Sequence, residues 1–381
     1  MKIALINPFY PPYIGGIEKH VQVLAEELSK KHEVIVVTSK FPVDSKEIEK
    51  INKNLTIYRL PVLDVNMPFL SPPPALIGFN VRKAFELIKD CDIVHLHNRW
   101  FPSFLRLLRK CKRIGIKTFI TFHEPVVFSV SEGFDNFARM YDDLWTKKFL
   151  KFTSGFFAVS EYVKKTLISE FKIKENKINV CYNGVNLKLY KKISKNNLFK
   201  RRYDINYDYV LFVGRLVEQK GLKTLMKTFE ILKEKGINAI VIGKGSEKQK
   251  MVNYKLRKNL TNVRFIDEFV PENLLFHAYS GASCFIMPSL WEAFGMVCIE
   301  AMACGCPVVV SKTGGLKEIV NDGVNGFLVK VKDYKTFAKK TVEILDNEKL
   351  RNNFIKNGYK TVKDKFDWSY TFKVVDEAYK K

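Results

Sequence analysis

The chain has 381 residues, of which 46% are hydrophobic and 27% are charged. At roughly 100–200 residues per domain, this length predicts two or three domains, and the apolar content excludes disordered and collagen-like chains. The 64 Lys and Arg residues against 40 Asp and Glu residues give a formal net charge of +24, which attracts nucleotides, phospholipid surfaces and nucleic acids alike.

Short runs of β-branched and aromatic residues alternate with amphipathic stretches, a pattern that predicts βα units and parallel sheets. The runs fall into two series. The first comprises Lys2–Ile6, Val34–Thr38, Ile93–Leu96, Thr118–Phe122 and Phe156–Val159, and the second comprises Tyr209–Val213, Ala239–Ile242, Val263–Ile266, Ser283–Met287 and Pro307–Val310. We therefore expect an α/β protein with two parallel-sheet domains.

A basic segment separates the two series. Residues 188–203 include seven Lys or Arg residues and no acidic residue, which is typical of a solvated connector. We place a linker at residues 188–207, between an N-terminal domain of residues 1–187 and a C-terminal domain of residues 208–361. The stretch after residue 347 predicts helices with a break near Asp367 and Trp368.

The first predicted strand leads into a proline-rich loop that ends in Gly15 and Gly16, at the start of a predicted helix. In a parallel sheet this loop lies at the carboxyl end of the strand, where ligands bind. Two glycines at a helix N-terminus let a phosphate approach backbone N–H groups and the positive end of the helix dipole. The loop has the form of an anion site, although two glycines taken alone fit a flexible turn better.

Two patterns in the first domain are similar to metal sites. Asp90-Cys-Asp92 spells an Asp-x-Asp metal motif, but it precedes the strand Ile93–Leu96 and so lies at the amino end, away from the ligand edge. His95 and His97 share one face of that strand, and His123 on another strand completes a candidate three-histidine zinc set. No carboxylate clearly supports this set. We favour packing or acceptor-side roles for His95 and His97, and we expect no metal.

The strand Tyr209–Val213 delivers the loop Gly214–Gly221, which contains Arg215 and Lys220, again just before a helix. The planar fork of an arginine and the point charge of a lysine together suit the two phosphates of a nucleotide diphosphate. In so basic a chain, two such residues can also be ordinary surface residues. Their place beside two glycines at the ligand edge favours binding.

The strand Ser283–Met287 ends before a loop that carries Glu292, and a helix that carries Glu300 begins near Gly295. Two carboxylates eight residues apart, with a glycine at the helix entry, can serve two parts of one ligand. A solvated pair of glutamates is the alternative. Because Glu300 stands among apolar residues, where an unpaired charge is costly, we interpret it as functional.

Seven short motifs occur along the chain in a recognisable order. They are Gly15-Gly-Ile-Glu-Lys-His20, Tyr182-Asn-Gly-Val185, Gly214-Arg-Leu-Val-Glu-Gln-Lys-Gly221, Gly243-Lys-Gly245, Pro288-Ser-Leu-Trp-Glu292 continuing through Glu300 to Gly305, Thr313-Gly-Gly315 and Asn325-Gly-Phe-Leu-Val329. In this order the chain resembles family 4 of the retaining nucleotide-sugar glycosyltransferases, also described as glycosyl transferases group 1. The likeness covers nearly the whole chain and is densest from Tyr209 to Val329.

The resemblance implies a GT-B fold, in which two Rossmann-like domains face a central cleft and a C-terminal helix, here residues 362–381, packs back on the N-terminal domain. It implies that Arg215 and Lys220 hold the donor diphosphate and that Glu300 holds the ribose. It assigns the transferred sugar to Glu292 together with the backbone of Phe294, Gly295, Met296 and Val297. Gly15 and Gly16 close over the phosphates, and His123 lies near the sugar. Glu124 follows this histidine where many members have Asp.

We therefore expect a retaining, metal-independent hexosyltransferase that moves a hexose from a nucleotide diphosphate sugar to an acceptor hydroxyl, in cell-surface glycan or glycolipid biosynthesis. No cofactor is expected beyond the nucleotide-sugar substrate. A non-hydrolysing sugar-nucleotide epimerase is the first alternative. A nucleic-acid-binding protein is the second, and only the net charge favours it, because no reader motif is present.

Cysteine usage and apolar runs predict the compartment. The seven cysteines form no Cys-x-x-Cys pair, and no apolar run is long enough for a signal sequence or a membrane span, so we expect a cytoplasmic protein. The basic, acid-free stretch 93–123 and the proline-rich apolar segment 63–79 favour docking on an anionic membrane at the cytoplasmic face. The expected acceptor is a lipid-linked glycan, a phospholipid or a saccharide.

Overall fold

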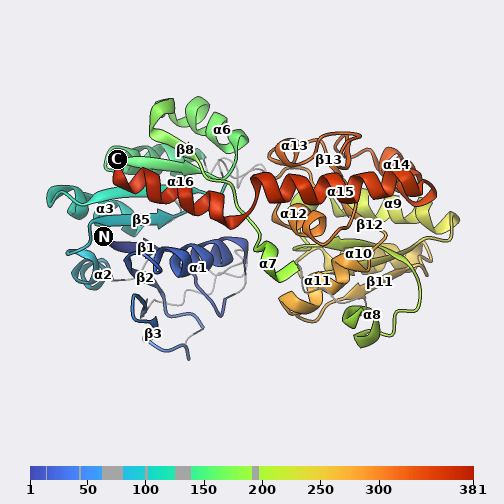
Figure 1. The fold of residues 1–381 in the computed structure, drawn as a ribbon, viewed down its shortest axis with the longest axis horizontal. Helices are drawn as coiled ribbons and strands as arrows, with labels where there is room; N and C mark the ends of the chain where they lie inside the picture. Colours follow the sequence, from blue (N-terminus) through green and yellow to red (C-terminus); the bar gives the residue numbers. More distant parts are fainter. Residues whose placement is uncertain (14, 43, 62–79, 99–101, 125–138, 191–196) are drawn as a thin grey trace. The chain divides into compact units, whose positions relative to one another are not determined.

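The computed structural model describes residues 1–13, 15–42, 44–61, 80–98, 102–124, 139–190 and 197–381 (Figure 1). The chain divides into two units. Unit 1 comprises Met1–Tyr182 and Phe372–Lys381, and unit 2 comprises Asn183–Thr371. Each unit is built on a parallel sheet with helices around it, so the prediction of two α/β domains is confirmed.

The sheet of unit 1 has eight strands among the described residues, in the order β3-β4-β2-β1-β5-β6-β7-β8. Neighbouring strands run parallel except for β3, which pairs antiparallel with β4. The strands are β1 Lys2–Ile6, β2 Glu33–Ser39, β3 Ile48–Asn52, β4 Leu55–Leu60, β5 Ile93–His97, β6 Lys117–Phe122, β7 Gly155–Ala158 and β8 Ile178–Val180. The edge strands β3 and β8 and the strand β4 were not among the predicted strands.

Helices α1 and α16 pack on the sheet of unit 1 through apolar faces. Val21, Leu24 and Leu28 of α1 share one buried cluster with Val375 and Tyr379 of α16. The helices of unit 1 are α1 Gly16–Leu28, α2 Val81–Ile88, α3 Pro102–Arg113, α5 Lys147–Leu150 and α6 Glu161–Phe171, with short turns at η1 Asp142–Thr146 and η2 Glu175–Lys177; the end of α16 Trp368–Lys380 completes the set.

Unit 2 contains a six-stranded parallel sheet among its described residues, in the order β11-β10-β9-β12-β13-β14. The strands are β9 Tyr209–Val213, β10 Asn238–Ile242, β11 Val263–Ile266, β12 Cys284–Met287, β13 Val308–Ser311 and β14 Phe327–Val329. The helical elements are α7 Leu187–Tyr190, α8 Leu198–Arg202, η3 Glu218–Lys220, α9 Leu222–Glu234, α10 Lys248–Arg257, α11 Glu272–Ser280, α12 Met296–Ala303, α13 Leu316–Ile319, α14 Tyr334–Asp346 and α15 Glu348–Lys365. Both β9 and β11 have the bounds that the sequence predicted.

The boundary between the units differs from the predicted linker at residues 188–207. Part of that segment forms α8, whose Phe199 is fully buried in unit 2 beside the ring of Tyr209. This basic sequence therefore contains buried apolar residues, Phe199 and Ile205, and this part of the segment belongs to a packed domain. At the other end, α15 and the first residues of α16 belong to unit 2, and only Phe372–Lys381 belong to unit 1.

The seven cysteines are free thiols, and six of them are buried. Burial raises the pKa of Cys91 and Cys111 to about 12, so these thiols stay protonated at neutral pH.

Among the helices of the described ranges, none combines the length and the apolar character needed to cross a membrane.

Candidate functional site

The predicted ligand loops of unit 2 meet at the carboxyl edge of its sheet. Strands β9 and β12 pair in parallel, so the loop after β9 and the loop after β12 leave the sheet side by side. The strand order reverses between these two strands, because β10 and β11 lie on one side and β13 and β14 on the other. Such a reversal is the place where open α/β sheets bind ligands.

An ion pair joins the two loops. The Lys220 ammonium lies 2.5 Å from Oε1 of Glu292, and the side chains are only 13% and 9% exposed. The hydroxyl of Ser289 donates to the same carboxylate oxygen at 3.0 Å. A cation that is partly shielded from water and held in one position is suited to meet the charge of an anionic ligand.

Glycines allow the loops to pack this closely. Gly221 has a φ of +64°, and a Cβ at this position would lie 2.0 Å from the carbonyl oxygen of Pro288. Gly314 has a φ of +46°, and a Cβ there would lie 1.8 Å from the carbonyl oxygen of Glu292. Side chains at either position would push the backbones apart. The Gly-rich motifs of the sequence therefore hold the Lys220–Glu292 pair in place.

Glu300 lies on α12, half-buried, about two turns after the helix start at Gly295. The hydroxyl of Tyr279, a fully buried residue of α11, donates to Oε2 of Glu300 at 2.9 Å. This bond explains how a carboxylate is tolerated among the apolar residues of α12, since buried charges require polar partners. The structure thus pairs Glu300 with a tyrosine that sequence reasoning missed.

The remaining predicted residues of unit 2 lie on the same two loops. Arg215 is exposed directly after β9, in the loop that contains Lys220. Phe294 and Gly295 are buried, and Met296 and Val297 are half-buried in the first turn of α12. The structure therefore gathers all the predicted residues of this unit at one end of its sheet.

The predicted residues of unit 1 also lie at the carboxyl edge of a sheet. Gly15 is the residue before α1, and Gly16, its first residue, is exposed. His123 directly follows β6 and is 7% exposed. Its Nε2 atom lies 3.2 Å from Nδ1 of His97, at hydrogen-bond distance. The structure places His123 beside other histidines, and its place near the sugar stays a prediction.

The zinc set considered from the sequence contains the wrong third histidine. His95 is fully buried, with Nδ1 2.5 Å from the hydroxyl of Tyr379 and Nε2 2.6 Å from the hydroxyl of Thr121. Both ring nitrogens are thus bound to the protein. The histidines whose ring nitrogens converge are His20, His97 and His123, and we call these three residues the histidine cluster. The periodicity of α1 predicts only that the position of His20 faces the sheet.

Desolvation by burial holds the pKa of His97 and of His123 well below the usual value of a histidine, and their like-charged neighbours lower it further. These imidazoles are therefore neutral at pH 7.

The Asp-x-Asp sequence lies where it was expected, in the turn before β5, and Asp92 accepts a hydrogen bond from the backbone N–H of Lys2 at 2.7 Å.

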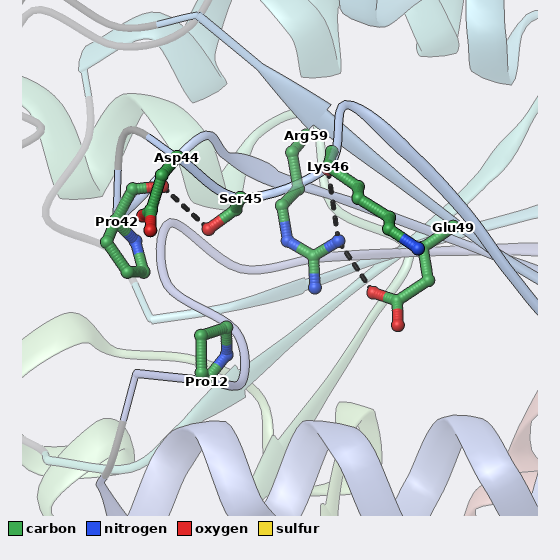
Figure 2. A pocket seen from close by; sticks show the side chains of 7 residues that line it. All are labelled: Pro12, Pro42, Asp44, Ser45, Lys46, Glu49 and Arg59. Carbon is green, nitrogen blue, oxygen red and sulfur yellow. Dashed lines mark hydrogen bonds and ion pairs between the residues drawn. The ribbon is translucent and has the colours of Figure 1, made fainter.

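A pocket of about 310 Å³ lies among the loops after β1 and β2 in unit 1 (Figure 2). Its wall includes the buried Arg59, whose guanidinium donates to the carbonyl oxygens of Pro11 and Lys46 and to the carboxylate of Glu49. These bonds go to protein groups from three segments. We therefore interpret Arg59 as a residue that fixes the loops at this edge of the sheet.

Two protein-family models match the chain in succession. The model described as Glycosyltransferase Family 4 matches residues 14–189, and the model described as Glycosyl transferases group 1 matches residues 194–361. An uncharacterized glycosyltransferase of Methanocaldococcus jannaschii is 30% identical over 100% of this chain and 98% of its own length. The capsular polysaccharide biosynthesis glycosyltransferase CapM of Staphylococcus aureus is 31% identical over 58% of this chain and 60% of its own.

A more distant relative is the phosphatidylinositol N-acetylglucosaminyltransferase GPI3 subunit of Saccharomyces cerevisiae, which is 23% identical over 99% of this chain and 82% of its own length. Two solved structures share the fold. Sucrose-phosphate synthase of Thermosynechococcus elongatus has a TM-score of 0.82 at 22% identity, covering 100% of this chain and 98% of its own. Anabaena HepE, in complex with UDP and glucose, has a TM-score of 0.78 at 20% identity, covering 99% and 98%.

Proposed function

This chain belongs to glycosyltransferase family 4 and has the GT-B fold, and from that premise we propose that it is a retaining, metal-independent hexosyltransferase that uses a nucleotide diphosphate sugar. Family membership makes it a transferase, which removes the epimerase and nucleic-acid-binding alternatives. The observation that best supports this proposed mechanism is the Lys220–Glu292 ion pair, which lies where the strand order of unit 2 reverses.

The proposed chemistry places cations at the leaving group. Breaking the bond between the anomeric carbon and the diphosphate oxygen leaves negative charge on the diphosphate. Lys220 and Arg215 follow β9 on one loop, where they can meet that charge without a metal ion. The acceptor hydroxyl attacks the same face of the sugar, and its proton passes to the departing phosphate oxygen.

The carboxylates hold the uncharged parts of the donor in this proposal. Glu300, oriented by the hydroxyl of Tyr279, accepts hydrogen bonds from the ribose. Glu292 orients Lys220 and binds hydroxyl groups of the sugar, with the backbone at Phe294–Val297 beside it. The family likeness assigns Gly15 and Gly16 to the phosphates and His123 to the sugar.

We propose an acceptor in glycan or glycolipid synthesis, at a membrane surface. The names of CapM and of the GPI3 subunit refer to capsular polysaccharide and to phosphatidylinositol, a polymer and a lipid that carry sugars. Helix α3 exposes Arg106, Arg109, Lys112 and Arg113, which supports attraction to anionic lipid headgroups. The other half of the membrane hypothesis, residues 63–79, lies outside the described residues.

A thermal-shift series tests the proposal. Because HepE was solved with UDP and glucose, UDP and UDP-glucose are the first ligands to test, beside GDP, ADP and their sugars. A ligand at 100 times its Kd adds about 2.7 kcal/mol of stability, which gives a clear rise in Tm. Nucleoside monophosphates serve as controls that lack the second phosphate. If every nucleotide diphosphate leaves Tm unchanged at millimolar concentration, the donor assignment is wrong.

A further inference from the structure

The histidine cluster of unit 1 brings three imidazoles together from three elements. His20 comes from α1, His97 from β5 and His123 from the end of β6, and none is more than 7% exposed. The ring centroids form a nearly regular triangle, with separations of 5.4 Å for His20–His97, 4.9 Å for His20–His123 and 5.5 Å for His97–His123. One ring nitrogen from each residue lies within 4.8 Å of the other two.

This geometry is close to that of three histidines around a tetrahedral ion. A zinc–nitrogen bond of about 2.0–2.1 Å and a tetrahedral angle separate two coordinating nitrogens by roughly 3.4 Å and two ring centroids by roughly 5 Å. The observed 3.2 Å between Nδ1 of His97 and Nε2 of His123 is near that nitrogen separation. The ligand nitrogen of His20 lies within 4.8 Å of the other two, so it must move closer to them when an ion binds.

The hydrogen bonding of the cluster also fits a metal ion. A metal ion needs one nitrogen lone pair from each ligand, and an imidazole supplies one from either Nδ1 or Nε2. Nε2 of His97 is buried and has no hydrogen-bond partner within the described ranges, so the ring is bound to the protein through Nδ1 alone. His95 lies two residues before His97 on the same strand. Both of its ring nitrogens are hydrogen-bonded to other residues, so it offers no nitrogen to an ion.

We propose that His20, His97 and His123 form a binding site for one divalent transition-metal ion, with Zn²⁺ as the best match and a fourth position left for water or an anion. The ion takes the place of the proton between Nδ1 of His97 and Nε2 of His123. Each neutral ring keeps one proton, which then lies on the nitrogen away from the ion, Nε2 of His97 or Nδ1 of His123, so binding releases no proton from these two rings and involves no change of oxidation state.

Metal binding has a consequence for activity, and this consequence rests on the proposed function. If His123 approaches the transferred sugar, an ion on Nε2 of His123 fixes that imidazole and blocks its contact with substrate. Zinc is then an inhibitor, whereas the chemistry at Arg215 and Lys220 needs no metal. The cluster lies in unit 1, whereas Arg215 and Lys220 belong to unit 2.

The direct test measures binding, not turnover. Zn²⁺ affinity is measured by competition with a chromophoric chelator, and Co²⁺ serves as a probe because a tetrahedral site gives intense visible absorption. We expect one ion per chain. His20→Gln and His97→Gln should each weaken binding by more than about 100-fold, since even outer partners of metal ligands are worth roughly 10–100-fold.

The matched control is His95→Gln, which removes an equally buried histidine of the same strand and should leave Zn²⁺ affinity within about threefold. His277→Gln, in unit 2, is a second control. Should the variants fail to fold, imidazole NMR of the wild-type chain decides. Zinc should shift the signals of His20, His97 and His123 and leave those of His32, His95 and His277, the other histidines of the chain, in place.

Two results would overturn the site: no binding of Zn²⁺ at equimolar micromolar concentrations, or undiminished binding in both His20→Gln and His97→Gln. The two proposals fail separately. A chain that binds zinc in the cluster but transfers no sugar contradicts the proposed function only. A chain that transfers sugar but binds no zinc contradicts the metal site only.

Discussion

At the residue scale, Lys220 matters because its ammonium is held between two loops. Its bond to Glu292, which Ser289 also holds, fixes the charge in one place. A lysine in water gains no such orientation, because its long side chain samples many rotamers. An oriented cation acts on a developing anion without reorganising, which is the largest contribution that such sites make to catalysis.

We expect Lys220→Ala and Arg215→Ala each to lower kcat/KM by about 10²–10³-fold, because each removes a cation from the leaving diphosphate. Steady-state kinetics with the donor identified by thermal shift measures this loss. Lys235→Ala is the matched control, since it removes an exposed lysine at the other end of α9. Near wild-type kinetics for both site variants, with Tm within a few degrees, would contradict the assignment.

Glu300→Gln should raise KM for the donor by about 10–100-fold with little change in kcat, because hydrogen bonds to charged groups contribute about 1.5–3 kcal/mol and the ribose is bound equally in ground and transition states. The measurement is the KM and kcat of the variant. Glu230→Gln is the control: Glu230 accepts a hydrogen bond from Tyr254 at 2.6 Å, as Glu300 does from Tyr279, but on the surface between α9 and α10. An unchanged KM in Glu300→Gln would remove the ribose role.

At the element scale, two helices of unit 1 make contacts that their sequences only partly predict. Helix α3 packs Phe104, Leu107 and Leu108 inward, and this burial accounts for its apolar face. Two of its basic side chains also contact the protein. The Arg109 guanidinium lies 5.3 Å from the ring centroid of Phe152, and Lys112 donates to the carbonyl oxygen of Lys151 at 3.0 Å. These contacts limit the freedom of the cations and hold them at one surface.

The double variant Arg109→Glu with Arg113→Glu should bind anionic vesicles at least about 30-fold more weakly at low salt, because each basic residue near a membrane contributes about 1 kcal/mol. Cosedimentation measures binding, and high salt should abolish it in the wild type. The control is Lys356→Glu with Lys360→Glu, which reverses two exposed charges at the same spacing on α15 in unit 2. Equal binding of the wild type to neutral and anionic vesicles would refute the membrane hypothesis.

The last helix, α16, is fixed to unit 1 by a carboxylate as well as by its apolar face. Asp376 accepts hydrogen bonds from His32 at 2.8 Å and from Lys380 at 2.6 Å. Burial acts to raise the pKa of Asp376, but the two hydrogen bonds and their charges outweigh it, and the pKa lies below its usual value. A carboxyl with a lowered pKa stabilises the folded state above its ordinary pKa of about 3.9 and stops doing so as the pH falls through its folded value.

Asp376→Asn should therefore destabilise the docking of α16 by about 1–2 kcal/mol at pH 7. The difference from the wild type should begin to shrink below about pH 4, the ordinary carboxyl pKa, and should vanish once the pH falls below the lowered pKa of Asp376 in the folded state. Hydrogen exchange of the α16 amides as a function of pH measures this. Glu377→Gln, the exposed neighbour, should have no comparable effect. A difference that persists unchanged at pH 2 would show that the carboxylate charge is not responsible.

At the scale of the whole molecule, the two units contain different parts of the proposed sites. The donor loops with their cations lie in unit 2, and the histidine cluster, α3 and the Arg59 pocket lie in unit 1. In the proposed mechanism the fixed cations of unit 2 replace a metal ion. The histidine cluster of unit 1 supplies no metal to the transfer, and zinc bound there would block the contact of His123 with the sugar.

Turnover should therefore persist in excess EDTA, and EDTA should restore the rate of enzyme inhibited by added Zn²⁺. The physical reason is that Arg215 and Lys220 already supply the charge that a Mg²⁺ or Mn²⁺ ion would supply. Initial rates with and without chelator measure this. Complete loss of activity in EDTA, regained on addition of Mn²⁺ or Mg²⁺, would contradict the metal-independent mechanism.

The sequence by itself determined the class of fold and the places of the loops that we propose to bind the donor. Strands such as β9 and β11 were predictable because buried parallel strands are continuous apolar runs, bounded by glycine or polar residues. The edge strands β3 and β8 escaped prediction because edge strands need not be apolar; β3 is largely exposed. The linker was misplaced because a few buried residues, Phe199 and Ile205 among them, decide whether a basic segment packs.

Only the tertiary structure decided which side chains meet. Lys220 and Glu292 are 72 residues apart, and they pair because β9 and β12 are neighbours in the sheet. His20, rather than His95, joins His97 and His123, because Tyr379 and Thr121 bind both nitrogens of His95. A sequence pattern fixes the face on which a residue lies through the period of its own helix or strand. Partners from other elements depend on strand order and packing, which no local pattern encodes.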